Sequence, residues 1–321
     1  MSNARRIILE WAERGHIAVS DVPQALALAG VLPSRDAWRG FIDRLLLWMG
    51  TLLVGGGLIF FLAYNWAELG RFSRFALVEV LLLAALAVVW RVGLDRPGGK
   101  AALFAACLFV GALLALIGQT YQTGADTFEL FGAWAAMILP WVLVAHTAAL
   151  WVLWLTLVNL AIVLYFQAFP GVFGMLFGTE RQMWVLFAFN TAVLCVWELL
   201  AARRGQAAGE RWGPRFMASA SGGLITALAM MQILDPRDSS LWAVLAWLVW
   251  LALAWVVYRL RLRDVFVLAG GVLSVIVVVA TFLVRRLDGG AAGFLLTGLI
   301  VLALSAVGGW WLKKVAAEDV Q

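Results

Sequence analysis

The sequence predicts an all-α protein, a polytopic transmembrane helix bundle of about ten spans that follows a short N-terminal helical preface. The first observation is composition, because 64% of the 321 residues are hydrophobic and only 13% are charged. The second is a mean hydropathy of +0.93, which excludes an ordinary soluble domain. The third is the recurrence of apolar runs close to the roughly 17 to 25 residues that a helix needs to cross a bilayer.

Residues 1–44 are more polar and predict a cytoplasmic or interfacial helical hairpin. Ile8 and Trp11 recur at helical spacing until Gly15, and a second helix then has a capping residue at Ser20 or Asp21. A hairpin of this size cannot bury its own core, so we expect it to pack on the membrane domain, on a partner or in the lipid interface. No cleavage site follows a short apolar core, and we expect no cleaved signal peptide.

Residues 45–314 contain the spans, and residues 315–321 are expected to form a short cytoplasmic tail. The ten predicted spans are residues 45–64, 75–90, 101–117, 131–145, 148–166, 183–201, 216–234, 241–258, 265–284 and 294–312. The fourth and fifth spans form the weakest division, because only His146 and Thr147 separate them. Nine spans is therefore the alternative count.

The distribution of positive charge predicts that both termini are cytoplasmic, in the inner membrane of a bacterium. With ten spans and the N-terminus inside, three quarters of the 24 basic residues fall in inner segments, as the positive-inside rule requires. A nine-span chain would place the arginine-rich residues 203–215 and 259–263 outside. These basic clusters flank apolar segments, which suits the lipid bilayer as partner and makes nucleic acid a poor one. Cys107 and Cys195 lie in apolar runs and indicate buried thiols without a disulfide.

Residues 111–131, GALLALIGQTYQTGADTFELF, join an apolar helix to a group of amides, hydroxyls and carboxylates. A stripe of small residues that includes Gly111 and Gly118 would allow this helix to approach glycines 55–57 of the first span. On a continuous helix, four of the polar side chains that follow share one face: Gln119, Gln122, Thr123 and Asp126.

The chain order places this stretch and the end of the first span on the same outer side, where we expect one small cavity. The candidate ligand-binding residues are Asn65, Trp66, Glu68, Glu79, Gln119, Tyr121, Gln122 and Asp126. Such a cavity is neutral to acidic and suits a cation, a polyol or a lipid headgroup better than an anion. The alternative interpretation is that these residues are separate helix-end caps.

Ionisable residues inside the predicted spans are few, and each costs about 2.5 to 3.5 kcal/mol at a helix centre. Glu79 is either a proton or cation ligand, or the partner of Arg71 or Arg74 in an ion pair. Glu198, near the inner end of the sixth span, is explained by pairing with Arg203. Several neutral polar residues are expected to join helices by hydrogen bonds rather than to bind a ligand: Asn159, Gln167, Asn190 and Gln232.

The sequence has no catalytic or metal-binding pattern, and we predict no cofactor. Only two histidines are present, without an H-E-x-x-H motif or a Ser-His-Asp arrangement. The lysines all lie outside the spans, so a Schiff base inside the bundle has no anchor. An enzyme that acts on lipid is a distant third hypothesis, because no nucleophile–base pair is visible, although Glu68, Asp126 and Glu129 could serve a metal.

Three segments carry a resemblance to a known family. They are LAYNWAEL at residues 62–69, GALLALIGQTYQTGA at residues 111–125 and LFGAWAAMILP at residues 130–140, and the Gly-His-Ile turn of the preface accompanies them. Together they resemble the predicted membrane proteins grouped as domain of unknown function 2157 (DUF2157), over roughly residues 1–150. The resemblance implies a multispanning bacterial inner-membrane protein and brings no cofactor or catalytic residue with it.

Two functional hypotheses follow. The first is a small-molecule or ion transporter with an outward-facing polar site, in which five spans on either side of residues 169–182 would be inverted relative to each other. The second is a non-catalytic membrane scaffold or sensor that docks a periplasmic or membrane partner through the outer polar surface. The first predicts a cavity at the midplane, and the second predicts a shallow outer surface above solidly packed spans.

Overall fold

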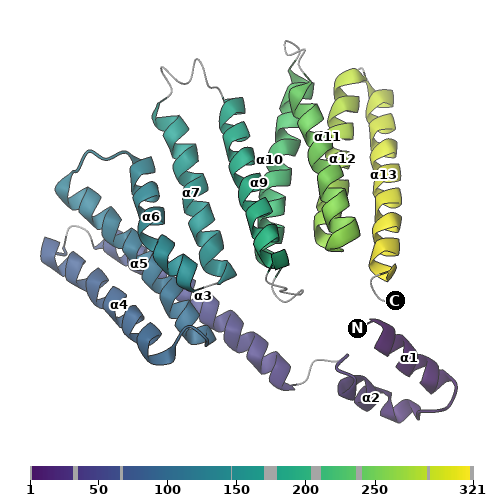
Figure 1. Cartoon of the computed structure of the whole chain (residues 1–321), viewed down its shortest axis with the longest axis horizontal. Helices are drawn as coiled ribbons and strands as arrows, with labels where there is room; N and C mark the ends of the chain where they lie inside the picture. Colours follow the sequence, from purple (N-terminus) through teal and green to yellow (C-terminus); the bar gives the residue numbers. More distant parts are fainter. Residues whose placement is uncertain are drawn as a thin grey trace. The chain divides into compact units, whose positions relative to one another are not determined.

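The computed structural model describes residues 2–31, 35–65, 68–145, 147–169, 179–203, 211–235, 241–287 and 290–318. All regular elements among these residues are helical, which confirms the predicted fold class (Figure 1). The chain divides into two compact units, unit 1 (Met1–Leu150) and unit 2 (Trp151–Asp319).

Unit 1 begins with a helical hairpin in which α1 packs against α2. Its elements are α1 (Ser2–Glu13), the 3-10 helix η1 (Val19–Asp21) and α2 (Val22–Leu28). The helices end in Gly15 at φ +74° and Gly30 at φ +67°, a left-handed conformation that glycine adopts without a Cβ clash. The hairpin buries Ile8 but leaves Leu28 exposed, so much of its apolar surface remains uncovered.

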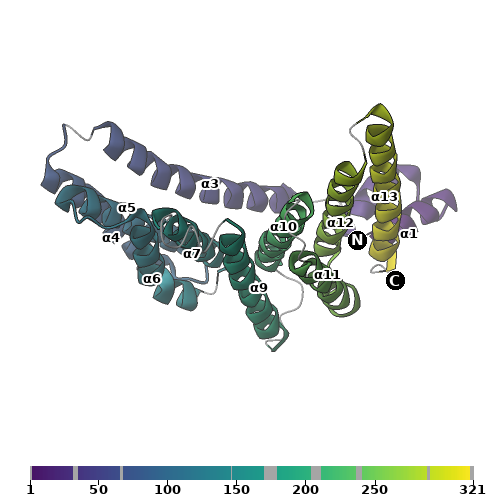
Figure 2. The ribbon, with the colours of Figure 1, turned by 90° about the horizontal axis from the view of Figure 1, so that it is seen from above.

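Four long apolar helices complete unit 1, and α5 is the central one. They are α3 (Arg35–Tyr64), α4 (Arg71–Val92), α5 (Pro97–Tyr121) and α6 (Thr127–Ala145). α5 packs against each of the other three, and Figures 1 and 2 both show α4 alongside it. Burial on several sides explains why α5 has the longest series of buried residues in this unit.

Two glycines set how closely the helices of unit 1 approach one another. A Cβ on Gly55 would lie 2.6 Å from Leu108 Cδ1, and a Cβ on Gly111 would lie 2.3 Å from Trp134 Cε2. The Trp134 indole N–H donates to the Cys107 carbonyl at 2.8 Å. The first and third spans are neighbours as predicted, but Gly111 faces α6 rather than the glycines of α3, because it accommodates the Trp134 ring.

Unit 2 contains the remaining spans, with α10 packed against α9, α11 and α12, and α12 packed against α13. Its helices are α7 (Ala148–Ala168), α9 (Thr179–Arg203), α10 (Trp212–Leu234), α11 (Trp242–Trp255), the π-helix η2 (Val256–Arg261), α12 (Val265–Arg286) and α13 (Ala291–Glu318). The first three residues of α7 fall in unit 1. η2 continues α11 without a break, and together they form one span.

Ten helices of the described chain are long and apolar enough to cross a membrane, which confirms ten spans over nine. α6 ends at Ala145 and α7 begins at Ala148, so the weakest predicted division is a real break. α3 begins at Arg35, before the predicted start at residue 45, because the helix continues through the polar residues ahead of the bilayer core. The boundary between the units follows four spans, one span earlier than a five-plus-five division.

Candidate functional site

The predicted outer site starts at the end of α3. The Asn65 side-chain amide donates to the Phe61 carbonyl of its own helix at 2.9 Å, and the Asn65 carbonyl accepts from the Glu68 backbone N–H at 3.1 Å. Glu68 is exposed. Trp66 lies outside the described residues. Asn65 therefore closes its helix locally, as a helix-end cap does.

The polar end of α5 is shorter than the sequence suggested. The helix ends at Tyr121, and Gln122 takes a left-handed conformation with φ +46°. The helical face expected to run from Gln119 to Asp126 is therefore interrupted, because a left-handed residue redirects the chain. Gln119, Gln122 and Asp126 are all exposed, and the Asp126 backbone N–H donates to the Glu129 carboxylate at 3.2 Å, half of a capping box at the start of α6.

Apolar contacts bring these helix ends together. Leu62 of α3, Val78 of α4 and Leu116 of α5 belong to one buried cluster, and Phe75 packs against it. The Tyr121 ring centroid lies 6.2 Å from that of Phe75, while the tyrosine stays 61% exposed. The described site residues at the ends of α3 and α5 thus share one end of unit 1, and most of them are exposed on its surface.

Glu79 stands apart from this group. It is exposed on α4, about two turns below Arg71, and it makes no ion pair or hydrogen bond with any described residue. The sequence analysis did not single out the Thr120 hydroxyl, which is buried and has no hydrogen-bond partner among the described residues. A threonine at this position gives no pattern that would have identified it.

A charged cluster that the sequence analysis missed lies at one end of unit 2. Asp264, whose side chain is only 1% exposed, accepts two hydrogen bonds from Arg215 Nε at 3.1 and 3.0 Å. Arg211 Nε lies 3.2 Å from the same carboxylate. Asp264 also caps α12 by accepting from the Phe266 backbone N–H at 3.1 Å.

Glu198 extends this cluster to a third helix. Its carboxylate accepts from Arg211 Nη2 at 2.9 Å and from the Tyr258 hydroxyl at 3.0 Å. The side chain of Arg203, the expected partner, lies outside the described residues; Arg211 reaches Glu198 from the start of α10. The missed signal was Asp264 itself, a lone acid between a basic run and an apolar span.

Neutral polar side chains link the spans of unit 2. Asn190 Nδ2 donates to Asn159 Oδ1 at 2.6 Å, and Asn159 Nδ2 donates back at 3.2 Å, joining α9 to α7. The side-chain oxygen of Gln232 in α10 accepts from the Val244 backbone N–H of α11 at 3.0 Å. For these three residues the prediction of interhelical hydrogen bonding is confirmed.

Indole groups complete that network. Trp250 donates to Ser221 at 3.0 Å, and Trp247 donates to Ser274 at 2.8 Å. The Ser274 hydroxyl lies 2.6 Å from that of Thr226. These two indoles of α11 are thus fixed to serines of neighbouring helices, Trp250 to Ser221 of α10 and Trp247 to Ser274 of α12.

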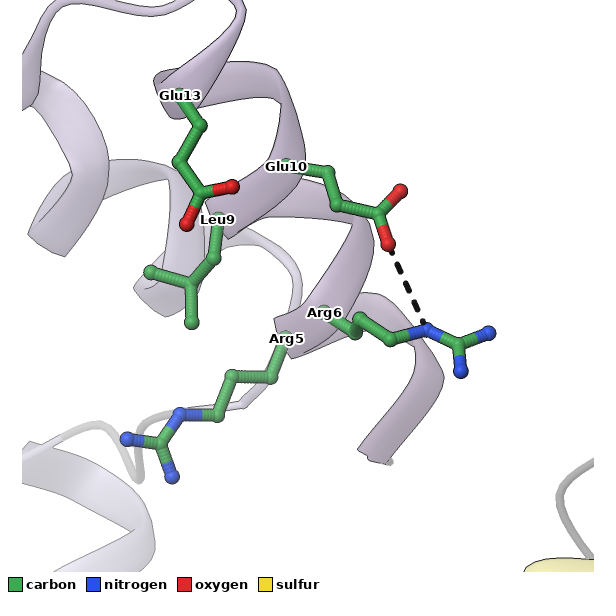
Figure 3. A pocket seen from close by; sticks show the side chains of 5 residues that line it. All are labelled: Arg5, Arg6, Leu9, Glu10 and Glu13. Atoms are coloured by element: carbon green, nitrogen blue, oxygen red, sulfur yellow. Dashed lines mark ion pairs between the residues drawn. The ribbon is translucent and has the colours of Figure 1, made fainter.

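Neither a metal centre nor an enclosed binding site emerges from these groups. No set of three or more His, Cys, Asp or Glu residues placed to hold a metal occurs among the described residues. One open hollow lies against α1, with Arg5, Leu9 and Glu13 along it and Arg6 paired to Glu10 at 3.8 Å (Figure 3). Its charged side chains come from one helix and are well exposed, so the ion pair contributes little.

The fold and these groups define a multi-span membrane protein whose polar groups lie at span ends and between packed helices. Residues 9–151 match the model of the family described as predicted membrane protein (DUF2157), which confirms the resemblance. No curated protein and no solved structure matches the chain. The family match ends one residue beyond unit 1, so the matched region and the compact unit coincide.

Proposed function

We propose that this protein is a non-catalytic membrane scaffold or sensor that docks a periplasmic or membrane partner through one polar surface of unit 1. This outer surface consists of Asn65, Glu68, Gln119, Tyr121, Gln122 and Asp126. The observation that carries the proposal is that five of these six residues are exposed, and Asn65 is half-buried, above a solidly packed apolar cluster. Groups that extend from a surface meet a partner, whereas the groups of a carrier line an enclosed space.

The chemistry of the outer surface indicates the kind of partner. It offers amides, a phenol and two carboxylates, so it suits a segment with basic side chains or hydrogen-bond donors. The charge distribution favours a bacterial inner membrane with both termini in the cytoplasm. In that orientation the outer surface faces the periplasm.

Site-specific photo-crosslinking in native membranes tests the docking proposal. A photoreactive residue at Gln119 or at Gln122 should give discrete protein adducts, because the partner holds these side chains in a fixed interface. Trp90, at the other end of α4 and 89% exposed, is the matched control and should give none.

A triple variant, Gln119→Ala with Tyr121→Ala and Gln122→Ala, should abolish the adduct formed by a photoreactive residue at Asp126 and leave solute uptake unchanged. Crosslinks confined to lipid at Gln119 and Gln122 would contradict docking. So would an unchanged adduct in the triple variant.

A small-molecule or ion transporter with an outward-facing polar site is the second candidate. The amide pair of half-buried Asn159 and buried Asn190 favours it, because polar groups within a bilayer mark many substrate pathways. Each of these amides also donates to a carbonyl of its own helix at 2.8 Å, which uses its hydrogen-bonding capacity within the protein. For that reason the docking proposal stands first.

A further inference from the structure

Arg215 is held in one orientation by two contacts. Its Nε donates to both oxygens of the buried Asp264 carboxylate, at 3.1 and 3.0 Å, and its guanidinium carbon lies 5.7 Å from the centre of the Phe266 ring. The Arg215 side chain is nevertheless 42% exposed. It is therefore a fixed cation at the surface of unit 2.

The far edge of this guanidinium is available. Both hydrogen bonds of Arg215 to Asp264 use Nε, and neither Nη1 nor Nη2 bonds to another described residue. Arg211 differs, because it also engages Glu198 through Nη2 and the Leu262 carbonyl through Nη1 and is only 20% exposed. The two terminal nitrogens of Arg215 form a planar fork, the geometry that binds carboxylate or phosphate through two hydrogen bonds.

The surroundings of Arg215 are those of a bilayer interface. It lies in the first turn of α10, and Phe266 lies in the first turn of α12, both at the ends of spans. Three aromatic side chains near these helix starts are 43%, 47% and 54% exposed: Trp212, Phe216 and Phe266. Tryptophan is enriched at the depth of the lipid headgroups in either leaflet, so Trp212 places this end of the unit at that depth, with the two exposed phenylalanines beside it.

The local charge distinguishes the headgroup. Asp264 is shared by two arginines, and the exposed Arg261 and Arg263 precede it in the chain. This end of the unit therefore attracts a ligand with net negative charge more strongly than a zwitterion.

We propose that Arg215 binds the phosphate of an anionic phospholipid through Nη1 and Nη2, with Phe216 and Phe266 against the lipid. Asp264 acts as the positioning residue, because it holds the fork in place without contacting the lipid. The proposal concerns unit 2 and is independent of the docking surface of unit 1.

The test is thermal unfolding of the full chain in detergent, with phosphatidylglycerol, phosphatidylcholine or inorganic phosphate added. Phosphatidylglycerol should raise the midpoint of unfolding of the wild type, and the other two should not. In Arg215→Lys, which keeps the charge and loses the fork, apparent lipid affinity should fall roughly tenfold. Lys314→Gln, which removes an exposed charge elsewhere in the unit, is the control and should respond like the wild type.

Each shift is measured against the variant's own lipid-free midpoint, so a loss of intrinsic stability does not obscure it. Phe266→Ala retains the ion pair and should also weaken the response. A full response in both Arg215→Lys and Phe266→Ala would overturn the proposal. An equal shift with inorganic phosphate would indicate a free-anion site, and an equal loss in Lys314→Gln would indicate nonspecific attraction; either result overturns it.

Discussion

Asp264 joins three parts of unit 2 through one side chain. It pairs with Arg211 and Arg215 and also caps α12. A carboxylate that is removed from water in this way is stable only while its cations and donors remain in place. Its neighbours depend on it in the same way, because Arg211 is itself largely buried.

Asp264→Asn should therefore lower the free energy of unfolding by about 3 kcal/mol, because it removes the buried carboxylate from an ion-pair cluster. Among the described residues, Glu198 then remains as the one carboxylate paired with either arginine, through Arg211. Asparagine can still accept from the Phe266 N–H, so the loss reports on the charge rather than on the cap. Thermal or denaturant unfolding in detergent measures it.

The control is Glu318→Gln, which breaks the pair between Glu318 and Arg259. Glu318 is 42% exposed, so its loss should cost less than about 1 kcal/mol. Equal effects of the two substitutions would contradict a special role for Asp264.

At the scale of elements, the contact between α5 and α6 depends on the absence of a side chain at Gly111. Gly111→Ala would place a methyl group 2.3 Å from Trp134 Cε2. The indole would have to move and lose its hydrogen bond to the Cys107 carbonyl. We expect a loss of about 1 to 3 kcal/mol in unfolding free energy, typical of overpacking.

Gly118→Ala in the same helix is the matched control. The nearest atom to its new Cβ is Thr123 Oγ1 at 4.0 Å, so the substitution should be neutral or slightly stabilising. If Gly118→Ala lowered the unfolding midpoint as much as Gly111→Ala, the close approach of Trp134 would not be the cause.

The helices themselves were predictable, because span length and apolar composition are local properties of the sequence. Ten spans and the break before Ala148 follow from them. The end of α5 was not predictable. The helix ends because Gln122 takes a left-handed conformation, and a non-glycine residue gives no signal of such a turn in the sequence. The pairing of Asp264 with Arg215 was also missed, since residues 49 positions apart meet only through the packing of two spans.

The candidate site residues also divide into those whose role could be predicted from the sequence and those whose role could not. Asn159, Asn190 and Gln232 were recognised because any polar group inside a span needs a partner. The role of each residue of the outer surface could not be derived from the sequence, because Asn65 and Asp126 form their hydrogen bonds within their own helix ends. Such local bonds have the same sequence signature as a ligand site.

At the scale of the whole molecule, the orientation proposal makes a direct prediction. In a background without Cys107 and Cys195, Asp126→Cys should react with a membrane-impermeant maleimide in intact cells, because the inner segments retain the positive charge. Lys314→Cys should react only after the cells are permeabilised. The reverse pattern would invert the proposed topology and place the outer surface of unit 1 in the cytoplasm.

The position of the boundary between the units bears on how such a chain can be built. Four spans precede the boundary and six follow it, so each unit holds an even number of crossings. An even number returns the chain to the side on which it started. Adding or deleting unit 1 would therefore leave every helix of unit 2 in its original direction, and a gene fusion at this point would be neutral with respect to insertion.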